Sequence, residues 1–415
     1  MRTSNHTSGS VPSRRRWRAA TALAAAAAVA LAGCGTPSGA RSDDSDTLKV
    51  GIVTSQTGLL SAVGARWENG FMAGLEYLTD GTMEIDGKKI ELLKGDDTGE
   101  ASVGTTVAKK HLSEGARILV GPATSAVAVP VADLAIQNDV LFVSGGAGTT
   151  DLVGYDKRVF LTNGNSPAGT YVYKEFLGDD TDGKTMATVN QDYAFGQAQA
   201  REMKTMLEPE GITVNSTMLP LDTVDFSAVA NKIRKDQPDY VHTNWIGAGQ
   251  TQLYSALASQ KALEGTTFFT TLFESAAWEG IGEALGDQVE DAHFAMMYYP
   301  HYDETEKAKF LLDYSKKKDH KVEDGDGAYG WSSAEMVYRA LSEGDPSDTD
   351  SMVDALQDWT FEGPMGDVTI RGEDNQVIPP YAVVNLVKKD GAWDVELDHV
   401  VPSKDITPAV VKPLK

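Results

Sequence analysis

Two loops carry residues that could together bind the acidic group of a small molecule. The first, residues 120–125 (VGPATS), leaves a predicted strand and enters a predicted helix. Hydroxyl groups and unpaired backbone N–H groups at a helix N-terminus can bind an anion. Thr124 or Ser125 could instead serve only as an ordinary N-cap, so both interpretations remain open for this loop.

The second loop, residues 144–150 (SGGAGTT), follows the next predicted strand. Its three glycines would let the backbone approach a ligand closely, and Thr149 or Thr150 could donate a hydroxyl hydrogen bond. Glycine-rich turns also occur for purely conformational reasons. Because loops that follow consecutive parallel strands are neighbours in space, the two loops together predict the floor of a carboxylate pocket.

Glu274 could bind a cation. It follows a predicted strand at 267–272, and its neighbours Leu272, Phe273 and Trp278 are apolar. A carboxylate partly buried there without a cation would cost on the order of several kcal/mol, which a ligand ammonium would offset. The alternative is an exposed glutamate that interacts with the dipole of a helix N-terminus. An aromatic acid without an amine would leave Glu274 without a role.

The other residue patterns argue against a metal site, a cofactor or an enzyme. None of the seven histidines forms a pair at metal-ligand spacing, and Cys34 is the only cysteine. Residues 324–327 (DGDG) lack the closing acid of a calcium loop and are interpreted as an acidic turn. Residues 280–282 (GIG) have no preceding predicted strand, so a dinucleotide loop is not expected. A Gly-x-Ser-x-Gly elbow and a Walker-type lysine are both missing from the sequence.

The charge of the chain argues against nucleic acid as a partner. The 415 residues include 60 acidic and 37 basic ones, for a formal net charge of −23. The first 33 residues contain five arginines and no acid, so the remainder carries −28. No dense basic stretch that could bind a phosphate backbone occurs outside this N-terminal segment.

Residues 1–33 are typical of a signal peptide. The basic stretch 13–18 (SRRRWR) precedes fourteen small, uncharged residues at 19–32, too few to span a bilayer. Residues 31–34 (LAGC) resemble the lipobox of bacterial lipoproteins, in which the cysteine is acylated. A buried cysteine at the end of a core helix fits poorly, because the residues at 34–46, predicted to be a tether, are polar. General secretion is the default, and the arginine pair also resembles a twin-arginine signal.

The rest of the chain alternates predicted strands with predicted helices. A hairpin is expected at 83–93 around Asp86-Gly87. The main expected strands lie at 48–53, 117–120, 140–143, 185–190, 212–219, 240–244 and 267–272, and the helices between them at 65–78, 101–114, 125–138, 170–177, 194–207, 226–235 and 250–261. Further helices are expected beyond 292–299, at 305–317, 328–341 and 351–359, and extended segments at 366–370, 381–387 and 393–397. This alternation predicts an α/β protein with two lobes built on mostly parallel sheets.

Short segments along residues 47–400 resemble the substrate-binding lipoproteins of ABC importers, of the leucine/isoleucine/valine-binding kind. The segments that carry the resemblance are 49–52 (KVGI), Thr57-Gly58, Asp96-Asp97, 120–122 (VGP) with Ser125 and Pro130, 144–150, 192–196 (DYAFG) and Asp225-Phe226. The resemblance implies the type I periplasmic-binding fold, a clamshell of two Rossmann-like lobes. Lobe 1 would comprise 47–164 and 299–379, lobe 2 would comprise 165–298 and 380–400, and 401–415 would be a C-terminal tail.

The resemblance also implies roles for individual residues. Ser125 and the loop Gly146 to Thr149, including Gly148, would hold a ligand α-carboxylate, and Glu274 the α-ammonium. The side-chain pocket would be lined by Val63, Trp245, Phe195 and Tyr329, with Tyr193 as a further ligand-binding candidate. Two positions depart from the family pattern. Val63 replaces a commonly aromatic residue, and Gly148 stands where the family has a threonine, so Thr149 would have to substitute.

The expected function is to bind a small amphipathic solute, most consistent with a branched-chain amino acid, and to deliver it to an ABC permease with its ATPase subunits. The protein is expected to be a monomer that is lipid-anchored on the extracytoplasmic face of the bacterial cell membrane, without a cofactor. Aromatic acids or amides are alternative ligands, since residues 192–196 also resemble relatives that take these up. A ligand sensor of the same fold is a second alternative. A surface-anchored hydrolase would need a nucleophile and a base, which the sequence does not show.

The anchor prediction can be tested with one substitution. Cys34→Ala removes the thiol that would be acylated, so we expect the variant to move from the membrane fraction to the soluble fraction. Immunoblotting of fractionated cells measures this shift. Unchanged membrane association of the variant would contradict acylation at Cys34.

Overall fold

The structure of the chain is a computed structural model that describes residues 47–58, 60–162, 166–247, 249–272, 275–318, 325–410 and 412–414. The predicted signal peptide, Cys34 and the tether lie outside these residues, as does Glu274. Within the described part of the chain, no helix is both long and apolar enough to cross a bilayer.

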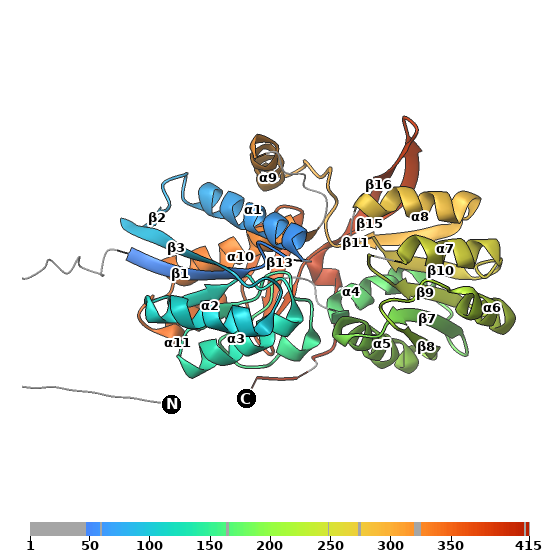
Figure 1. Cartoon of the computed structure of the whole chain (residues 1–415), viewed down its shortest axis with the longest axis horizontal. Helices are drawn as coiled ribbons and strands as arrows, with labels where there is room; N and C mark the ends of the chain where they lie inside the picture. Colours follow the sequence, from blue (N-terminus) through green and yellow to red (C-terminus); the bar gives the residue numbers. More distant parts are fainter. Residues whose placement is uncertain are drawn as a thin grey trace, which may run out of the picture. The chain divides into compact units, whose positions relative to one another are not determined.

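The first sheet has six strands in the order β2-β3-β1-β4-β5-β6. Strands β1, β2 and β3 of this sheet are labelled in Figure 1. Its strands are β1 (Thr47–Thr54), β2 (Glu84–Ile85), β3 (Lys88–Asp96), β4 (Ile118–Val120), β5 (Leu141–Val143) and β6 (Val159–Phe160), and the helices between them are α1 (Ser61–Leu78), α2 (Ala101–Ser113) and α3 (Ser125–Gln137). All pairings are parallel except that of β2 with β3. Asp86 and Gly87 both have positive φ, as the predicted two-residue hairpin turn requires.

The second sheet has seven strands in the order β16-β15-β11-β10-β9-β7-β8. Its strands are β7 (Thr185–Gln191), β8 (Thr213–Leu219), β9 (Tyr240–Asn244), β10 (Thr267–Thr271), β11 (Ala292–Met296), β15 (Tyr381–Lys389) and β16 (Ala392–Val401). Its helices are α4 (Ser166–Val172), α5 (Ala194–Leu207), α6 (Ser227–Asp236), α7 (Gln250–Ser259) and α8 (Trp278–Leu285). Strands β7 to β11 are parallel, whereas β15 pairs antiparallel with β11 and β16. Two distant segments of the chain therefore build one sheet.

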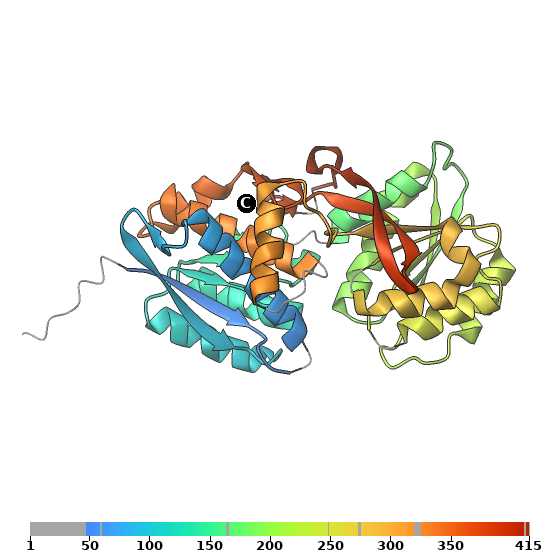
Figure 2. The same cartoon turned by 90° about the horizontal axis from the view of Figure 1, so that it is seen from above.

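Three helices and a small sheet lie between β11 and β15 in the sequence. They are α9 (Glu306–Lys317), α10 (Gly325–Ser342), α11 (Thr349–Leu356), and the antiparallel strands β12 (Thr360–Gly363), β13 (Gly366–Arg371) and β14 (Gln376–Ile378). Helix α10 packs closely on α1, as the view from above also shows (Figure 2). Gly330 permits this approach, because an added Cβ there would lie 2.0 Å from the Trp67 carbonyl oxygen. Helices α10 and α11 and the small sheet share one hydrophobic cluster with the first sheet, whereas Leu311 and Tyr314 of α9 belong to the cluster of the second sheet.

The C-terminal segment, which was predicted to be a tail, packs against residues of the second sheet and of the small sheet. Ile406 is buried in a cluster with residues of the second sheet, and the Thr407 hydroxyl donates a hydrogen bond to Tyr171 Oη. Beyond this point the chain contacts the small sheet, since Arg371 donates to the carbonyl of Pro408 and the Leu414 N–H donates to the carbonyl of Glu373. The segment is thus fastened at both of its ends.

Two glycine-containing segments adopt structures that the sequence interpretation missed. Gly325, Asp326 and Gly327 begin α10 instead of forming an acidic turn, and Asp326 pairs with Arg66 at 2.9 Å. An acid in the first turn of a helix is favoured by the helix dipole, which is consistent with Asp326 at the start of α10. Residues 280–282 lie inside α8, where Gly282 makes room for the Trp393 ring.

His242 is a buried titratable residue at the centre of the second sheet. It lies on β9, its two ring nitrogens have no hydrogen-bond partner among the described residues, and its ring centroid is 4.7 Å from that of Tyr173. Burial lowers the pKa of His242 from 6.5 to about 3. The folded protein therefore holds this imidazole neutral well below the pH at which an unfolded chain would protonate it.

The pKa difference predicts a loss of stability in acid. Below about pH 6.5 the unfolded state binds a proton that the folded state rejects, so from there down to about pH 3 the unfolding constant should rise roughly tenfold per pH unit through this residue. His242→Phe keeps an aromatic ring and removes the titration. Urea unfolding of both proteins at pH 7 and pH 5 should show a shallower pH dependence for the variant. Equal pH dependence would contradict the assignment.

Candidate functional site

The carboxyl ends of β4 and β5 bring the two predicted loops into direct contact. The Gly121 N–H donates to the Val143 carbonyl at 3.2 Å, and the Ala147 N–H donates to the Pro122 carbonyl at 3.3 Å. A Cβ added to Gly145 would lie 2.7 Å from the Gly121 oxygen. The loops therefore touch through their backbones, an approach that a side chain at position 145 would prevent.

At the start of α3, the residue that caps the helix differs from the residue that is the candidate for binding an anion. Thr124 is the N-cap, and its hydroxyl oxygen accepts a hydrogen bond from the Ala126 N–H at 3.0 Å. Ser125 is the first helical residue and is half-buried. Since Thr124 caps the helix, the Ser125 hydroxyl at the positive end of α3 is not required for that purpose.

Val63 lies beside the glycine loop. An added Cβ on Gly146 would be 3.5 Å from Val63 Cγ1 and 3.6 Å from the Ala123 oxygen, which are ordinary contact distances. Val63 comes from α1, Ala123 from the loop after β4, and Gly146 from the loop after β5. The structure therefore brings three segments together at one end of the first sheet, with the apolar side chain of Val63 next to the half-buried Gly146.

The end of the glycine loop is fixed by a short helical turn. The Thr149 hydroxyl oxygen accepts from the Asp151 N–H at 3.2 Å and caps η2 (Thr150–Leu152). Thr149 is buried, whereas Gly146 and Gly148 are half-buried. A hydroxyl that accepts one bond can still donate its own proton, so this cap does not remove Thr149 as a donor. Ser144, at the other end of the loop, is fully buried, and its Oγ has no partner among the described residues.

A second polar loop at the same sheet edge was not assigned from the sequence. The Asp96 carboxylate accepts bonds from the N–H groups of Gln56, Thr57 and Thr98 and from the Thr57 hydroxyl. Desolvation would raise the pKa of Asp96, but these hydrogen bonds outweigh it and hold the pKa below its ordinary value. Asp96 is therefore ionised and holds Gln56 and Thr57 in place; Asp96 and Thr57 both belong to segments that carry the sequence resemblance.

Asp97 behaves differently from its neighbour. It is fully buried, and its Oδ1 accepts from Ser55 Oγ at 2.6 Å and from the Gly99 N–H at 2.8 Å. Desolvation raises the pKa of Asp97 despite these bonds. Ser55 follows β1 and Asp97 follows β3, so this pair joins the ends of two adjacent strands.

Two aromatic candidates follow β7 in the second sheet. Tyr193 precedes α5 and Phe195 lies in its first turn, with ring centroids 6.1 Å apart. Both are half-buried, and burial raises the pKa of Tyr193 to about 12, so its phenol is neutral. Gln191 joins this loop to the one after β9, because its amide both donates to the Ile246 carbonyl and accepts from the Ile246 N–H. No local sequence pattern predicts this hydrogen-bonded pair, because Gln191 and Ile246 are 55 residues apart.

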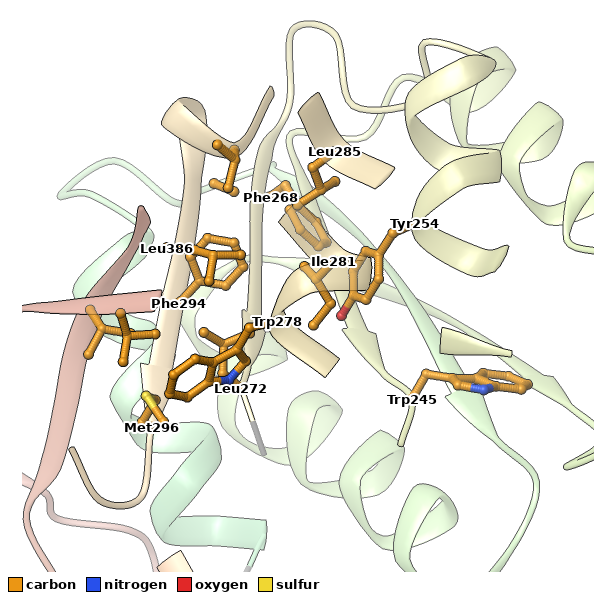
Figure 3. Close-up of a cluster of buried hydrophobic side chains, with 14 of the residues drawn as sticks. Trp245, Tyr254, Phe268, Leu272, Trp278, Ile281, Leu285, Phe294, Met296 and Leu386 are labelled. Atoms are coloured by element: carbon orange, nitrogen blue, oxygen red, sulfur yellow. The ribbon is translucent and has the colours of Figure 1, made fainter. Parts of the chain in front are cut away.

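Two other aromatic candidates lie inside the protein. Trp245 is 1% exposed and packs edge-on against Phe226, with centroids 4.8 Å apart. Trp245 belongs to the hydrophobic cluster of the second sheet. Figure 3 shows its ring at some distance from Trp278 and Ile281 of the same cluster. Tyr329 on α10 is 4% exposed, and its hydroxyl donates to Met297 Sδ. Packing of these large rings thus covers both residues almost completely.

The described residues contain no cluster of histidine, cysteine, aspartate and glutamate suited to a metal ion. A surface hollow of about 680 Å³ lies at the amino ends of β7, β9 and β10. It includes the Lys184–Asp239 ion pair, at 3.1 Å. This hollow is at the opposite edge of its sheet from Tyr193 and Trp245, which follow the carboxyl ends of their strands.

Comparisons with known proteins agree on one family. Residues 47–392 match the family described as periplasmic binding protein. A Leu/Ile/Val-binding protein of Rhizobium johnstonii is 30% identical over 59% of this chain and 68% of its own length. A leucine-, isoleucine-, valine-, threonine- and alanine-binding protein of Pseudomonas aeruginosa is 24% identical over 78% of this chain and 86% of its own length.

Solved structures show the same fold. An ABC-type branched-chain amino acid transporter protein of Rhodopseudomonas palustris superposes with a TM-score of 0.77 and 25% identity, covering 88% of this chain and 99% of its own. A solute-binding protein of an ABC transporter from another strain of that species, in complex with p-hydroxybenzoic acid, has a TM-score of 0.73 and 20% identity, covering 86% and 98%. The two-lobed α/β architecture predicted from the sequence is thereby confirmed.

The contact between the two loops predicts different effects on stability for alanine substitutions at two neighbouring glycines. Gly145→Ala would place its Cβ against the backbone of Gly121, so we expect the free energy of unfolding to fall by about 1–3 kcal/mol. Gly146→Ala meets only ordinary contacts and should leave this energy unchanged or raise it by up to about 1 kcal/mol. Denaturant unfolding of both variants compares them, and equal destabilisation would contradict this description of the loops.

Proposed function

The chain belongs to the periplasmic binding protein family, the non-enzymatic substrate-binding components of ABC transporters, and from this premise we propose that it binds an amino acid of the branched-chain type and delivers it to a permease. The family places the protein outside the cytoplasm. The observation that carries the proposal is the contact between the loops after β4 and β5, which puts Ser125, Gly146 and Val63 at one sheet edge.

The polar end of the ligand would bind to this sheet edge. A carboxylate would accept hydrogen bonds from Ser125 Oγ, at the positive end of α3, and from backbone N–H groups of the segment Gly146 to Thr149 other than that of Ala147, which donates to the Pro122 carbonyl. Charge-assisted bonds of this kind are stronger than bonds between neutral groups. Val63, adjacent to Gly146, would contact the first carbons of the ligand side chain.

The second lobe would supply the rest of the site. Glu274 would bind the α-ammonium, a role that rests on the sequence because this residue lies outside the described part of the chain. Tyr193 and Phe195 would offer half-buried aromatic surface to the ligand side chain. Trp245 and Tyr329, almost completely covered in this structure, would support the pocket walls or become accessible to the ligand through a rearrangement.

The mechanism we propose is closure of the two lobes around the ligand. Each half of the site binds weakly when its polar groups are hydrated, and excluding water strengthens the bonds at both ends of the amino acid. The ligand would favour the closed state by the difference between its affinities for the two states. A permease with its ATPase subunits could then distinguish loaded from empty protein. We further propose that the protein is a monomer anchored by a lipid on Cys34.

Aromatic acids are a second candidate ligand class. The observation that favours them is the Tyr193–Phe195 pair, together with the p-hydroxybenzoic acid bound by a structural relative. Such a ligand would use the same carboxylate site but would leave Glu274 without an ammonium. A sensor of the same fold would bind either class equally well, and a permease gene beside this one would favour transport.

The ligand class can be tested with Glu274→Gln. The substitution keeps the shape of the side chain and removes its charge, so L-leucine should lose about 2 to 4 kcal/mol of binding free energy. The deaminated analogue 4-methylpentanoate should bind the variant as well as, or better than, it binds the wild type. Calorimetric titration of both proteins with both compounds measures these affinities.

The same titration separates the candidate ligands. A thermal-shift screen with leucine, isoleucine, valine, benzoate and 4-hydroxybenzoate would precede it, since a ligand at 100 times its Kd stabilises the folded state by about 2.7 kcal/mol. Equal affinity of wild type and Glu274→Gln for leucine would remove Glu274 from the site. Stabilisation by 4-hydroxybenzoate alone would contradict the amino-acid assignment and favour aromatic acids.

A further inference from the structure

Three buried polar side chains connect the glycine loop to the helices behind it. They are Trp67 on α1, Ser333 on α10 and Thr162, which follows β6, and each is 0% exposed. We propose that Thr162 and Ser333 are positioning residues that orient the loop at 144–150 for an anionic ligand group. This inference rests on the proposed function and adds residues that do not themselves touch the ligand.

The contacts between these residues form a continuous series of hydrogen bonds. Trp67 Nε1 donates to Ser333 Oγ at 3.1 Å, and Ser333 Oγ lies 3.2 Å from Thr162 Oγ1. Thr162 Oγ1 in turn donates to the Ser144 carbonyl at 2.7 Å, with the Gly145 carbonyl at 3.2 Å. These residues are far apart in the sequence, so only the folded structure brings them together.

The number of available protons determines which group donates in each of these hydrogen bonds. The Thr162 hydroxyl has one proton, which it gives to the loop carbonyls because carbonyls can only accept. Thr162 Oγ1 can therefore only accept from Ser333. The Ser333 proton has two acceptors within reach, Thr162 Oγ1 and the Tyr329 carbonyl at 2.9 Å, while Ser333 Oγ accepts from the indole of Trp67. The hydroxyls thus present donors toward the loop.

Anchoring the carbonyls also orients the N–H groups of the loop. In a planar trans peptide the C=O and the following N–H point in opposite directions. When Thr162 holds the carbonyls of Ser144 and Gly145 toward the interior, the N–H groups of Gly145 and Gly146 are directed away from Thr162. Thr162 therefore fixes the orientation of a peptide group that the proposed function assigns to the ligand carboxylate.

The same series of hydrogen bonds extends to residues next to the segments that join the two large sheets. Thr162 is the last described residue before 163–165, which lead to α4. Ser333 contacts the carbonyl of Tyr329, whose phenol contacts Met297 directly after β11. The hydrogen bonds from Thr162 to Ser333 and from Ser333 to the Tyr329 carbonyl therefore connect the glycine loop to the part of α10 that contacts Met297.

The test compares Thr162→Val with Thr162→Ser. Valine keeps the shape of threonine without its donor, whereas serine keeps the donor. We expect Thr162→Val to weaken L-leucine binding roughly 10- to 100-fold, because the buried carbonyls of Ser144 and Gly145 lose their donor and the loop is no longer held in one orientation. Thr162→Ser should stay within about threefold of the wild type, since the hydroxyl is retained. Calorimetric titration measures the affinities, and thermal unfolding checks that each variant is folded.

A matched neutral ligand separates positioning from general damage. L-leucinamide keeps the side chain and the amine but lacks the carboxylate, so Thr162→Val should change its affinity much less than that of L-leucine. The pair 4-hydroxybenzoate and 4-hydroxybenzamide replaces it if the wild type binds only aromatic acids. If Thr162→Val does not fold, Ser333→Ala, which removes the donor to Thr162, should reduce the acid-to-amide affinity ratio in the same direction.

The outcomes distinguish this inference from the proposed function. An unchanged acid-to-amide ratio in Thr162→Val, or in Ser333→Ala where that variant replaces it, would overturn the positioning role while leaving the binding function intact. A wild type that binds none of the four compounds would contradict the proposed function, and this inference with it. A reduced acid-to-amide affinity ratio in Thr162→Val, together with a ratio close to that of the wild type in Thr162→Ser, would support both the proposed function and the positioning role.

Discussion

The close approach of two backbone loops at the carboxyl ends of β4 and β5 is the constraint on which the rest of the site depends. Parallel strands end at the same edge of a sheet, and each leaves N–H and C=O groups that need partners. Here the loops satisfy part of that need from each other, through the hydrogen bonds of Gly121 and Ala147. This contact requires a residue without a side chain at position 145.

Several polar groups behind this edge hold the loops in place. Thr124 caps α3, Thr149 caps η2, and Asp96 accepts hydrogen bonds from Gln56 and Thr57, which lie about 40 residues away in the sequence. Because Thr124 provides the N-cap, the neighbouring Ser125 hydroxyl is not needed for that purpose. The buried chain from Trp67 through Ser333 to Thr162 adds a connection to α1 and α10. A rigid first lobe would then present preorganised donors, and closure of the second lobe would exclude water from them.

Much of the fold could be predicted because its main elements have strong local signals. The buried residues of β1, the Asp86-Gly87 turn and the amphipathic pattern of α5 each specify an element without reference to the rest of the chain. The two-residue β6 and the three-residue β14 are too short for such a pattern. The small sheet was incomplete in the sequence prediction for the same reason.

The candidate site could be proposed from the sequence only where its residues follow one another along the chain. The two loops were identifiable from Ser125 and the glycines, and the structure places them in contact. The contributions of Thr162, Ser333 and Gln191 depend on partners 17 to 171 residues away, so no local pattern reveals them. For Trp245 and Tyr329, family resemblance implied a pocket lining, but their aromatic size also suits a core, and the structure buries both.

The most direct test of the account is a crystal structure of the mature protein with the tightest-binding amino acid from the screen. We expect the ligand carboxylate to lie within about 2.7–3.2 Å of Ser125 Oγ and the Gly146 nitrogen. We also expect the ligand ammonium to face Glu274. A carboxylate bound by the second lobe, or a ligand in the hollow at the amino ends of β7, β9 and β10, would contradict the central claim that the loops after β4 and β5 form the anion site.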